Sequence, residues 1–431
     1  MKVLVLGGGA REHALAWRLG RDPDVSGVVV APGNAGIAAD FPCVSVDPLD
    51  PAAVHGLAAS HGVDLTVVGP EAPLERGLAD HFRRTGRPIL GPSQRGAALE
   101  CSKVESKRFM DRHGIPTAPF VVCDTLDGAL GAISGEDFGF PVVIKADGLA
   151  AGKGVVIAED RSQAEAAVRA AMVDRQFGDA GTRLVIEQCL SGPEVSFFVL
   201  SDGERAVPLA SAQDHKRIWD DDRGPNTGGM GAFAPSPLMT PDIEDFTMRR
   251  VVAPVIEGMR AEVDPYVGFL YVSLMLTSDG PKVIEFNVRF GDPEAQVVLP
   301  HLTGPFGSTL YAAATGRLAN ATLRGGRDRF VGVVLASRGY PAMSESGRVI
   351  RGLEEAAALR NVLVFHAATR RDGDELVTAG GRVLTVVGQG ATFEDAMATA
   401  YGAAGRIAFD GVQYRRDIGR NAIATAAETR S

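Results

Sequence analysis

The stretch "PVVIKADGLAAGKGVVI", residues 141–157, decides the fold because it places a glycine-rich loop between two strands. Apolar and β-branched residues on both sides predict the strands, and Gly148, Gly152 and Gly154 predict the loop between them. The stretch is not a Walker loop, because no Ser or Thr follows Lys153 and a strand comes next instead of a helix. The sequence therefore predicts a hairpin of antiparallel strands here.

This hairpin has the composition of a loop that folds over a triphosphate. Backbone N–H groups of a glycine loop bind anionic oxygens, and Lys145 and Lys153 add positive charge. Lysine is scarce in the chain, since only seven of the 44 basic residues are lysine, and each is a candidate for a place that needs a compact ammonium. The alternative interpretation is a surface hairpin with two solvated lysines.

A second stretch, "VIEFNVRFGDPE" at residues 283–294, carries polar side chains at every other position. Because alternate side chains of a strand share a face, it is expected to have a polar face of Glu285, Asn287 and Arg289. The opposite face is expected to enter the core through Ile284, Phe286, Val288 and Phe290. A carboxylate and an amide oxygen suit Mg²⁺, and a guanidinium suits a phosphate. The alternative is a half-exposed strand with an ordinary polar face.

Two further stretches add polar groups. In "RLVIEQCLSGPEVSFFV", residues 183–199, Glu187 ends one strand and Glu194 begins another, which suits a purine edge and a ribose or, alternatively, a solvated hinge. In "SAQDHKRIWDDDRGPNTGGMGAFAP", residues 211–235, a charged run with Asp214 and Lys216 precedes a long glycine loop. Loops of this length and composition are commonly functional.

The N-terminal stretch "KVLVLGGGAREHALAW", residues 2–17, predicts a strand, a glycine turn and a helix. It does not complete the dinucleotide fingerprint, because the third glycine position falls on Glu12 and the next strand ends at Ala31 instead of an acid. We therefore predict a phosphate site without NAD, to which Arg11 adds charge. The alternatives are a nicotinamide-dependent oxidoreductase and an ordinary solvated helix turn at residues 11–13.

The order of these patterns predicts an α/β chain with three parts. Residues 1–100 are expected to form a parallel Rossmann-like sheet whose loops "GGGAREH", "PGNAG" and "GPEAPL" converge on one crevice. Residues 101–325 begin with the charged helix "CSKVESKRFMDRHGIP" and continue as an α+β part with antiparallel strands. Residues 326–431 are expected to form a small mixed α/β domain, which follows a boundary at "LRGGRDR".

Composition excludes several classes of function. The net charge of −9 and the absence of a basic run argue against nucleic-acid binding. Neither a signal peptide nor a membrane-spanning run is present, so we expect no membrane association. The four cysteines match neither a zinc nor a disulfide pattern, which favours a reducing cytoplasm.

Taken in order, "KADGLAAGKG", "IEQCLSGPEVS", "QDHKR", "GPNTGGMGA" and "EFNVRFGDPE" resemble the ATP-grasp fold. Together with "GGGAREHALAW", "PGNAG" and "VGPEAPL" they resemble, within that fold, the phosphoribosylamine-glycine ligase family, from Met1 to "RRDIG" near the end. The resemblance implies ATP-grasp lobes at 101–325, a small lid lobe at about 120–192, and a C-terminal domain that completes the active site.

The activity that the resemblance implies is a step of de novo purine synthesis. ATP, glycine and 5-phosphoribosylamine would give glycinamide ribonucleotide, ADP and phosphate through glycyl phosphate, with Mg²⁺ or Mn²⁺ as the metal. A cytoplasmic monomer that meets only small molecules is expected. The rival hypothesis, a catalytically silent nucleotide-binding regulator, would have no need of Glu285 and Asn287 together.

The resemblance also implies residue roles. ATP would be bound by Lys103, Lys145, Gly148, Gly152, Lys153, Gly154, Glu187, Leu190 and Glu194. The metal would be bound by Glu285 and Asn287, and the catalytic residues would be Asp214, Lys216 and Arg289. The other substrates would be bound by Gly8, Gly9, Arg11, Glu12, His13, Pro32, Gly33, Asn34, Gly69, Glu71, Asn226, Thr227, Gly228, Asp292 and Glu294.

The departures from the family pattern are local. Cys101 stands where relatives usually have glycine, before Ser102 and Lys103. "ASRGYP" at 336–341 replaces a run of glycines, and "HLTGPFGS" at 301–308 lacks an acidic helix start. Ser273 stands where some ATP-grasp relatives carry a further carboxylate, so water or phosphate would have to complete the magnesium shell.

Overall fold

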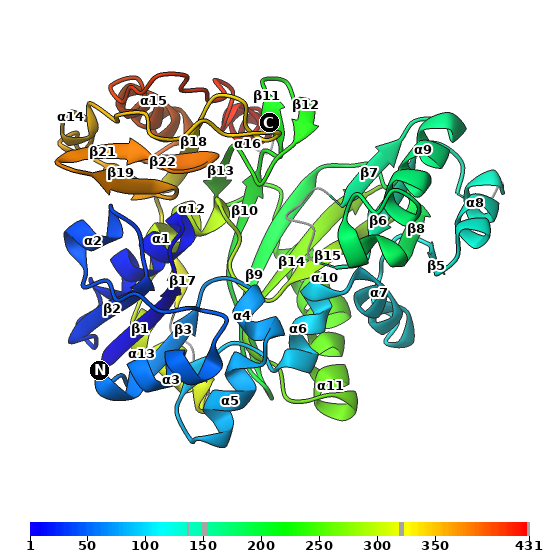
Figure 1. Ribbon diagram of the computed structural model, residues 1–431, viewed down its shortest axis with the longest axis horizontal. Helices are drawn as coiled ribbons and strands as arrows, with labels where there is room; N and C mark the ends of the chain where they lie inside the picture. Colours follow the sequence, from blue (N-terminus) through cyan, green and yellow to red (C-terminus); the bar gives the residue numbers. More distant parts are fainter. Residues whose placement is uncertain (136–137, 149–153, 319–322, 429–431) are drawn as a thin grey trace.

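The computed structural model describes residues 1–135, 138–148, 154–318 and 323–428, and Figure 1 shows how they are arranged. Two four-stranded sheets and one eight-stranded sheet form the frame. The mixed α/β fold with a parallel N-terminal sheet and antiparallel sheets after it confirms the predicted fold class. None of the described helices has the length and apolar character needed to cross a membrane.

The N-terminal sheet has the strand order β2-β1-β3-β4, and all its pairs are parallel. Its strands are β1 (Lys2–Gly7), β2 (Gly27–Pro32), β3 (Leu65–Val68) and β4 (Ile89–Leu90). The strands are apolar along their length because both faces are covered. The helices of this part are α1 (Ala10–Leu19), α2 (Ile37–Asp40), α3 (Pro51–Ser60), α4 (Ala72–Glu75) and α5 (Leu78–Arg84).

Two capped helices lead out of this sheet. In α6 (Gln94–Cys101) the Ser93 hydroxyl accepts a hydrogen bond from Gly96 N, and in α7 (Lys103–Arg112) the Ser102 hydroxyl accepts one from Glu105 N. Helix α7 ends at Arg112 and is capped by His113, followed by Gly114 at φ +60°, which confirms the predicted charged helix and its end. The caps fix where Lys103 enters the helix.

A four-stranded antiparallel lobe follows, in the order β5-β8-β6-β7. Its strands are β5 (Phe120–Cys123), β6 (Val142–Ala146), β7 (Val155–Ala158) and β8 (Leu184–Gln188). Its helices are α8 (Leu126–Ser134), α9 (Arg161–Met172) and the 3₁₀ turn η1 (Gly178–Thr182). Strands β6 and β7 pair as the predicted hairpin. Residues Gly152 and Lys153 of its loop lie outside the described residues.

The eight-stranded sheet has the order β15-β14-β9-β10-β13-β18-β22-β19, and its neighbours pair antiparallel (Figure 1). The first five strands are β9 (Glu194–Asp202), β10 (Ala206–Asp214), β13 (Gly231–Ala234), β14 (Val267–Thr277) and β15 (Gly280–Asn287). The last three are β18 (Arg329–Ala336), β19 (Val362–His366) and β22 (Arg382–Gly390). The C-terminal strands thus extend the same sheet.

Helices and pairs of short strands complete this part of the chain, and several of the helices pack on the sheet. The helical elements are α10 (Pro241–Thr247), η2 (Met248–Val252), α11 (Ala253–Glu262), α12 (Glu294–His301), α13 (Phe306–Ala314), α14 (Leu353–Ala357), α15 (Phe393–Ala404) and α16 (Arg420–Glu428). The short strands pair as β11 (Arg217–Trp219) with β12 (Arg223–Asn226), β16 (Leu302–Thr303) with β17 (Arg324–Gly325), and β20 (Thr369–Asp372) with β21 (Glu375–Thr378). Helix α12 packs against both α1 and β13, so it joins the N-terminal part to the large sheet.

A bulge in β15 corrects one expectation about the strand that carries the polar row. Ser273 of β14 pairs with Glu285 while the next residue, Leu274, pairs with Val283, so Ile284 is the extra residue. Val283, instead of Ile284, therefore enters the core together with Phe286. Ile284 is turned towards the cavity described below. A pattern of strict alternation could not predict this shift.

Candidate active site

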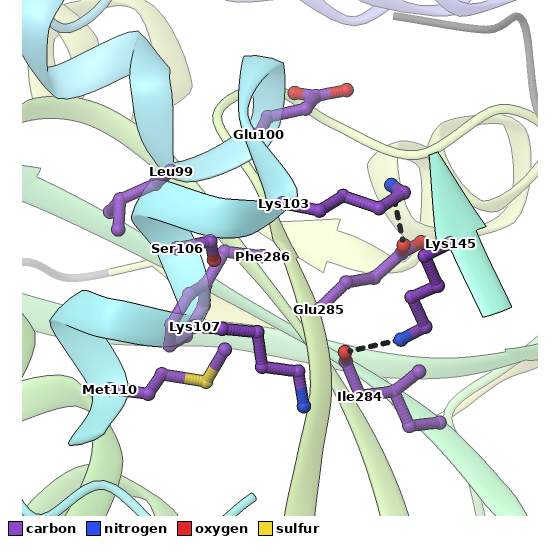
Figure 2. A pocket seen from close by; sticks show the side chains of 10 residues that line it. All are labelled: Leu99, Glu100, Lys103, Ser106, Lys107, Met110, Lys145, Ile284, Glu285 and Phe286. Atoms are coloured by element: carbon purple, nitrogen blue, oxygen red, sulfur yellow. Dashed lines mark hydrogen bonds and ion pairs between the residues drawn. The ribbon is translucent and has the colours of Figure 1, made fainter. Parts of the chain in front are cut away.

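Three elements bring lysines and a carboxylate to one small cavity, shown in Figure 2. Lys103 comes from the start of α7, Lys145 from β6, and Glu285 from β15. The Lys103 Nζ lies 3.6 Å from the Glu285 Oε2, and the Lys145 Nζ donates to the Ile284 carbonyl at 3.3 Å. The predicted ATP lysines Lys103 and Lys145 therefore meet the predicted metal ligand at one place.

Glu187, at the end of β8, lies between two ammonium groups. It pairs with Lys145 and with Lys107, whose Nζ is 2.5 Å from the Glu187 Oε2 and donates to the Thr117 hydroxyl at 2.6 Å. Lys107 is buried, and this burial lowers its pKa to about 8, although Glu187 acts in the opposite direction. The carboxylate of Glu187 is therefore held by the protein itself.

Lys107 was not among the predicted site residues. It lies one helical turn after Lys103 in "CSKVESK", so the two share a side of α7. In a chain with only seven lysines, that spacing was the signal that could have found it.

The metal-ligand candidates lie side by side on β15. Glu285 pairs across the sheet with Ser273, and Asn287 with Tyr271. Burial alone would raise the pKa of Glu285, but Lys103, Lys216 and Lys145 lower it to about 2. An ionised carboxylate beside an amide oxygen fits Mg²⁺, which takes one or two protein oxygens and fills its other positions with water and phosphate.

The rest of the described chain agrees with this donor set. Within it, no cluster of three or more His, Cys, Asp or Glu side chains could hold a metal ion. The described residues therefore offer no site for a metal that is held mainly by protein side chains. They fit a magnesium ion that is bound together with phosphate oxygens.

A second charged group, made of Lys216, Glu194 and Asp214, lies near Glu285. The Lys216 Nζ donates to the Glu194 Oε2 at 2.5 Å, at the point where β9 begins. Burial lowers the pKa of Lys216, but Glu194, Asp214 and Glu285 outweigh it, and the pKa lies above its usual value. Burial raises the pKa of Asp214 to about 7, with Glu294 and Glu194 adding to the rise and Lys216 opposing it.

Glu294, at the first position of α12, is buried and accepts hydrogen bonds from Tyr271 Oη at 2.8 Å and from Ser196 Oγ at 3.3 Å. Tyr271 is also the cross-strand partner of Asn287. The start of α12 is therefore tied to the strand that carries the metal-ligand candidates.

Arg289 connects the segment that carries the metal-ligand candidates to residues nearer the N-terminus. Its Nη2 donates to Glu100 at 2.5 Å, and its Nε donates to Glu71 at 3.3 Å. Burial raises the pKa of Glu100, although Arg289 opposes the rise. Glu100 was not predicted as a site residue, because the sequence of its own helix gives no information about a partner as far along the chain as Arg289. In this arrangement two carboxylates already balance the guanidinium that was predicted to meet a phosphoryl group.

In the N-terminal crevice, the Glu12 carboxylate fills the space beneath the glycine turn. It accepts hydrogen bonds from Gly9 N and from Arg11 Nε, both at 2.6 Å. A Cβ on Gly69 would lie 2.1 Å from the Glu12 Oε1. Arg11, Glu12 and His13 are all buried, so the interpretation as a solvated helix turn is wrong. The buried carboxylate explains why the dinucleotide pattern breaks at this position.

Two predicted substrate residues bind other parts of the chain. The Asn34 Nδ2 donates to the carbonyls of Gly8, His366 and Ala367 at 2.9, 2.8 and 3.1 Å. The His13 Nδ1 accepts a hydrogen bond from His366 N at 3.0 Å. These contacts join the "GGGAREH" and "PGNAG" loops to the end of β19, so the C-terminal part packs directly against both loops.

The remaining predicted residues lie on the loops around these groups. Thr227 N and Thr227 Oγ1 both donate to the Lys216 carbonyl at 2.8 Å, and Gly228 N donates to Tyr340 Oη at 2.9 Å. Gly33 follows Pro32 at the end of β2 with φ +75°. Asn226 ends β12, Leu190 lies in the link from β8 to β9, and Gly148 and Gly154 flank the hairpin loop.

A lysine-bearing antiparallel lobe opposed to a strand with a carboxylate and an amide defines an enzyme of the ATP-grasp class. Family models of the phosphoribosylglycinamide synthetase N domain, ATP-grasp (A) domain and C domain match residues 1–100, 101–295 and 330–421. The chain belongs to the phosphoribosylglycinamide synthetase family.

Individual relatives agree with this assignment. A phosphoribosylamine–glycine ligase of Allochromatium vinosum is 48% identical, and the match covers 98% of this chain and 99% of the relative. The crystal structure of the Thermotoga maritima phosphoribosylamine–glycine ligase has a TM-score of 0.82 at 33% identity, covering 97% of this chain and 100% of that one.

A more distant neighbour shares the fold alone. The biotin carboxylase domain of Hydrogenobacter thermophilus 2-oxoglutarate carboxylase, solved in complex with MgADP, has a TM-score of 0.71 at 19% identity, and the match covers 96% of this chain and 91% of that one.

Proposed function

We propose that this chain joins glycine to 5-phosphoribosylamine at the expense of ATP, giving glycinamide ribonucleotide, ADP and phosphate, as the names of its relatives indicate. The observation that carries the proposal is that the lysine-lined cavity and the N-terminal loops both border one stretch of the chain, residues 285–292. Glu285 borders the lysine-lined cavity, while a Cβ on Gly9 of the N-terminal crevice would lie 3.7 Å from the Asp292 Oδ2. The nucleotide cavity and the N-terminal loops therefore lie at the two ends of one short stretch of the chain, residues 285–292.

Activation of glycine is the first chemical requirement. A carboxylate is a poor electrophile, so an oxygen of glycine attacks the γ-phosphorus of ATP, ADP leaves, and glycyl phosphate forms. Lys103 and Lys145 balance the charge on the phosphates, because both ammonium groups lie at the cavity beside Glu285. Glu285 and Asn287 would hold Mg²⁺, which when bound neutralises phosphate charge. Mn²⁺ is proposed as an alternative ion at the same ligands.

Amide formation is the second requirement. The amine nitrogen of phosphoribosylamine attacks the acyl carbon, phosphate leaves, and the nitrogen loses a proton. We propose that Asp214 accepts this proton, because its raised pKa of about 7 lets this partly buried carboxylate take and release a proton near neutral pH. Lys216, held by Glu194, would steady the charge beside it.

The remaining assignments are proposed on the same basis. ATP is assigned to Lys103, Lys145, Lys153, Glu187, Leu190, Glu194 and the glycines of the 148–154 loop. Glycine and phosphoribosylamine are assigned to the loops at 8–13, 32–34, 69–71, 226–228 and 292–294. Arg289, held by Glu71 and Glu100, is proposed to orient the crevice against the phosphoryl-transfer site. The three-part division at residues 100 and 325, a monomeric state and a cytoplasmic location are proposed as well.

Oxygen-18 in the carboxylate of glycine tests this proposal. If glycine attacks the γ-phosphorus, one labelled oxygen must appear in each inorganic phosphate released during synthesis, and mass spectrometry of the phosphate measures it directly. Phosphate that carries solvent oxygen and none from glycine would contradict the acyl-phosphate route. The control omits phosphoribosylamine, and ADP release should then be slow.

A further inference from the structure

The guanidinium of Arg382 lies where the glycine loop, residues 227–230, meets the Asp292 turn, residues 291–293. Arg382 is the first residue of β22, in the C-terminal part of the chain. Its Nη1 donates to the Gly228 carbonyl at 2.6 Å, to the Asp292 carbonyl at 2.7 Å and to the Gly229 carbonyl at 3.4 Å. The same nitrogen lies 3.3 Å from the Asp292 carboxylate. One group therefore spans both segments.

The glycine loop and the Asp292 turn are also in direct contact. Gly229 has φ +108°, and a Cβ there would lie 2.4 Å from the Pro293 Cδ, so only glycine allows this approach. Tyr340, also from the C-terminal part, accepts the Gly228 N–H at 2.9 Å. The position of both segments thus depends on side chains of the C-terminal part.

A guanidinium is suited to this place because it stays charged and its Nη1 holds two N–H donors in the fixed plane of the group. The three carbonyl oxygens belong to irregular backbone, and a partly buried carbonyl needs a donor. The side chain of Arg382 is 22% exposed and that of Asp292 is 20% exposed, so water cannot replace the contacts freely. Without the guanidinium the carbonyls of the two segments would face each other with nothing between them.

We propose that Arg382 is a positioning residue that fixes the glycine loop 227–230 against the Asp292 turn, so that both segments contact the same glycine molecule. The inference rests on the proposed function, which assigns these segments to glycine and phosphoribosylamine together, and it takes glycine as the substrate that both segments contact. It predicts a selective effect: the lysines at the ATP cavity lie on α7 and β6, which Arg382 does not contact.

Steady-state kinetics of Arg382→Met test the proposal. We expect the KM for glycine to rise about tenfold or more and the KM for ATP to stay within about twofold, because binding geometry is lost on one substrate only. Arg382→Lys should fall between Met and the parent, since an ammonium keeps the charge beside Asp292 but does not hold its N–H donors in a fixed plane. Arg370→Met is the matched control: Arg370 is a half-exposed arginine of the same part, paired with Asp372 at 3.1 Å, and its loss should change neither constant.

Hydrogen exchange provides a readout that does not depend on activity. Thr227 N and Met230 N donate to the carbonyls of Lys216 and His215 at 2.8 Å, so peptides that cover 224–234 report the order of the loop. In Arg382→Met these peptides should exchange faster while those of α7 and β6 stay unchanged. Unchanged exchange in the loop, an unchanged KM for glycine, or equal increases in both KM values would overturn the proposal.

The two proposals fail in different ways. If the parent protein releases no ADP in response to glycine and phosphoribosylamine, the proposed function is wrong, and the exchange measurement still decides whether Arg382 orders the loop. If the parent is active and the exchange and kinetics of Arg382→Met match it, the proposed function stands and the positioning role of Arg382 is wrong.

Discussion

Asn34 gives the sharpest test of how the N-terminal crevice is built. Its Nδ2 donates to three carbonyls at 2.8–3.1 Å, and its Oδ1 accepts hydrogen bonds from Gly36 N and Ile37 N at 2.9 Å. A net hydrogen bond is worth about 1 kcal/mol, and an unpaired buried carbonyl costs more. The two Nδ2 hydrogens, which are shared among three carbonyls, and the two bonds to Oδ1 amount to about four hydrogen bonds. We therefore expect Asn34→Ala to lower the free energy of unfolding by about 3–4 kcal/mol.

Asn34→Asp tests the hydrogen bonds donated by Nδ2 separately from those accepted by Oδ1. The introduced carboxyl keeps the contacts of Oδ1 but presents an oxygen to three carbonyl oxygens, so its folded-state pKa should be raised above the unfolded value of about 4. The sign follows from linkage: stability is present below the unfolded pKa and is lost as pH rises through the raised folded pKa. The variant should therefore lose more stability at pH 8 than at pH 5, whereas Asn34→Ala should lose the same amount at both.

The assay uses Trp17, whose ring centroid lies 5.9 Å from that of Phe365 across the junction between α1 and β19. The chain has two tryptophans, so a Trp219→Phe background leaves Trp17 as the only indole reporter during urea unfolding. If Asn34→Ala unfolds within about 1 kcal/mol of the parent while the KM for phosphoribosylamine rises, Asn34 acts on substrate and our structural reasoning is refuted.

Three further predictions concern charge. Glu285→Gln should raise the Mg²⁺ concentration for half-maximal activity about tenfold or more, because it removes a charged ligand without changing shape, and an unchanged magnesium titration would contradict the site. Asp214 has a raised pKa of about 7, so kcat/KM should fall as pH drops below 7, and Asp214→Asn should lose that ionisation. The stability that is linked to Asp214 should decline as pH rises towards 7, so Asp214→Asn should be more stable relative to the parent at pH 8. The Arg415 side chain is 1% exposed and paired with Asp417 at 2.6 Å, so Arg415→Met should lose about 3–5 kcal/mol in urea unfolding. The exposed control Arg338→Met should lose less than about 1 kcal/mol, and equal losses would argue against the buried pair.

The sequence predicted the elements of this fold well because their patterns are local. The parallel strands at the N-terminus, the hairpin of β6 and β7, and the helix that ends at Arg112 each follow from apolar runs, glycines and caps within a few residues. The bulge that makes Ile284 an extra residue in β15 was outside that reach, because a bulge depends on the partner strand.

The site was predicted less evenly, for a related reason. Glu285 and Asn287 could be chosen because a short strand fixes their common face. Glu100 could not be assigned, because its partner Arg289 lies far along the chain and only tertiary packing brings them together. Lys107 could have been noticed from its spacing to Lys103, but its pairing with Glu187 could not be predicted. His13 was predicted to bind substrate, and its Nδ1 accepts a hydrogen bond from His366 N in the C-terminal part, a contact that the sequence did not predict.

The eight-stranded sheet has a consequence for any attempt to shorten this protein. Strand β13 is hydrogen-bonded to β10 on one side and to β18 on the other, and a chain that stops near residue 325 would lack β18. The backbone groups and the buried apolar side chains of Gly231–Ala234 would then form an open sheet edge, which invites pairing with another copy. Fragments that end there should aggregate on expression, so the C-terminal strands act as the molecule's protection against self-association.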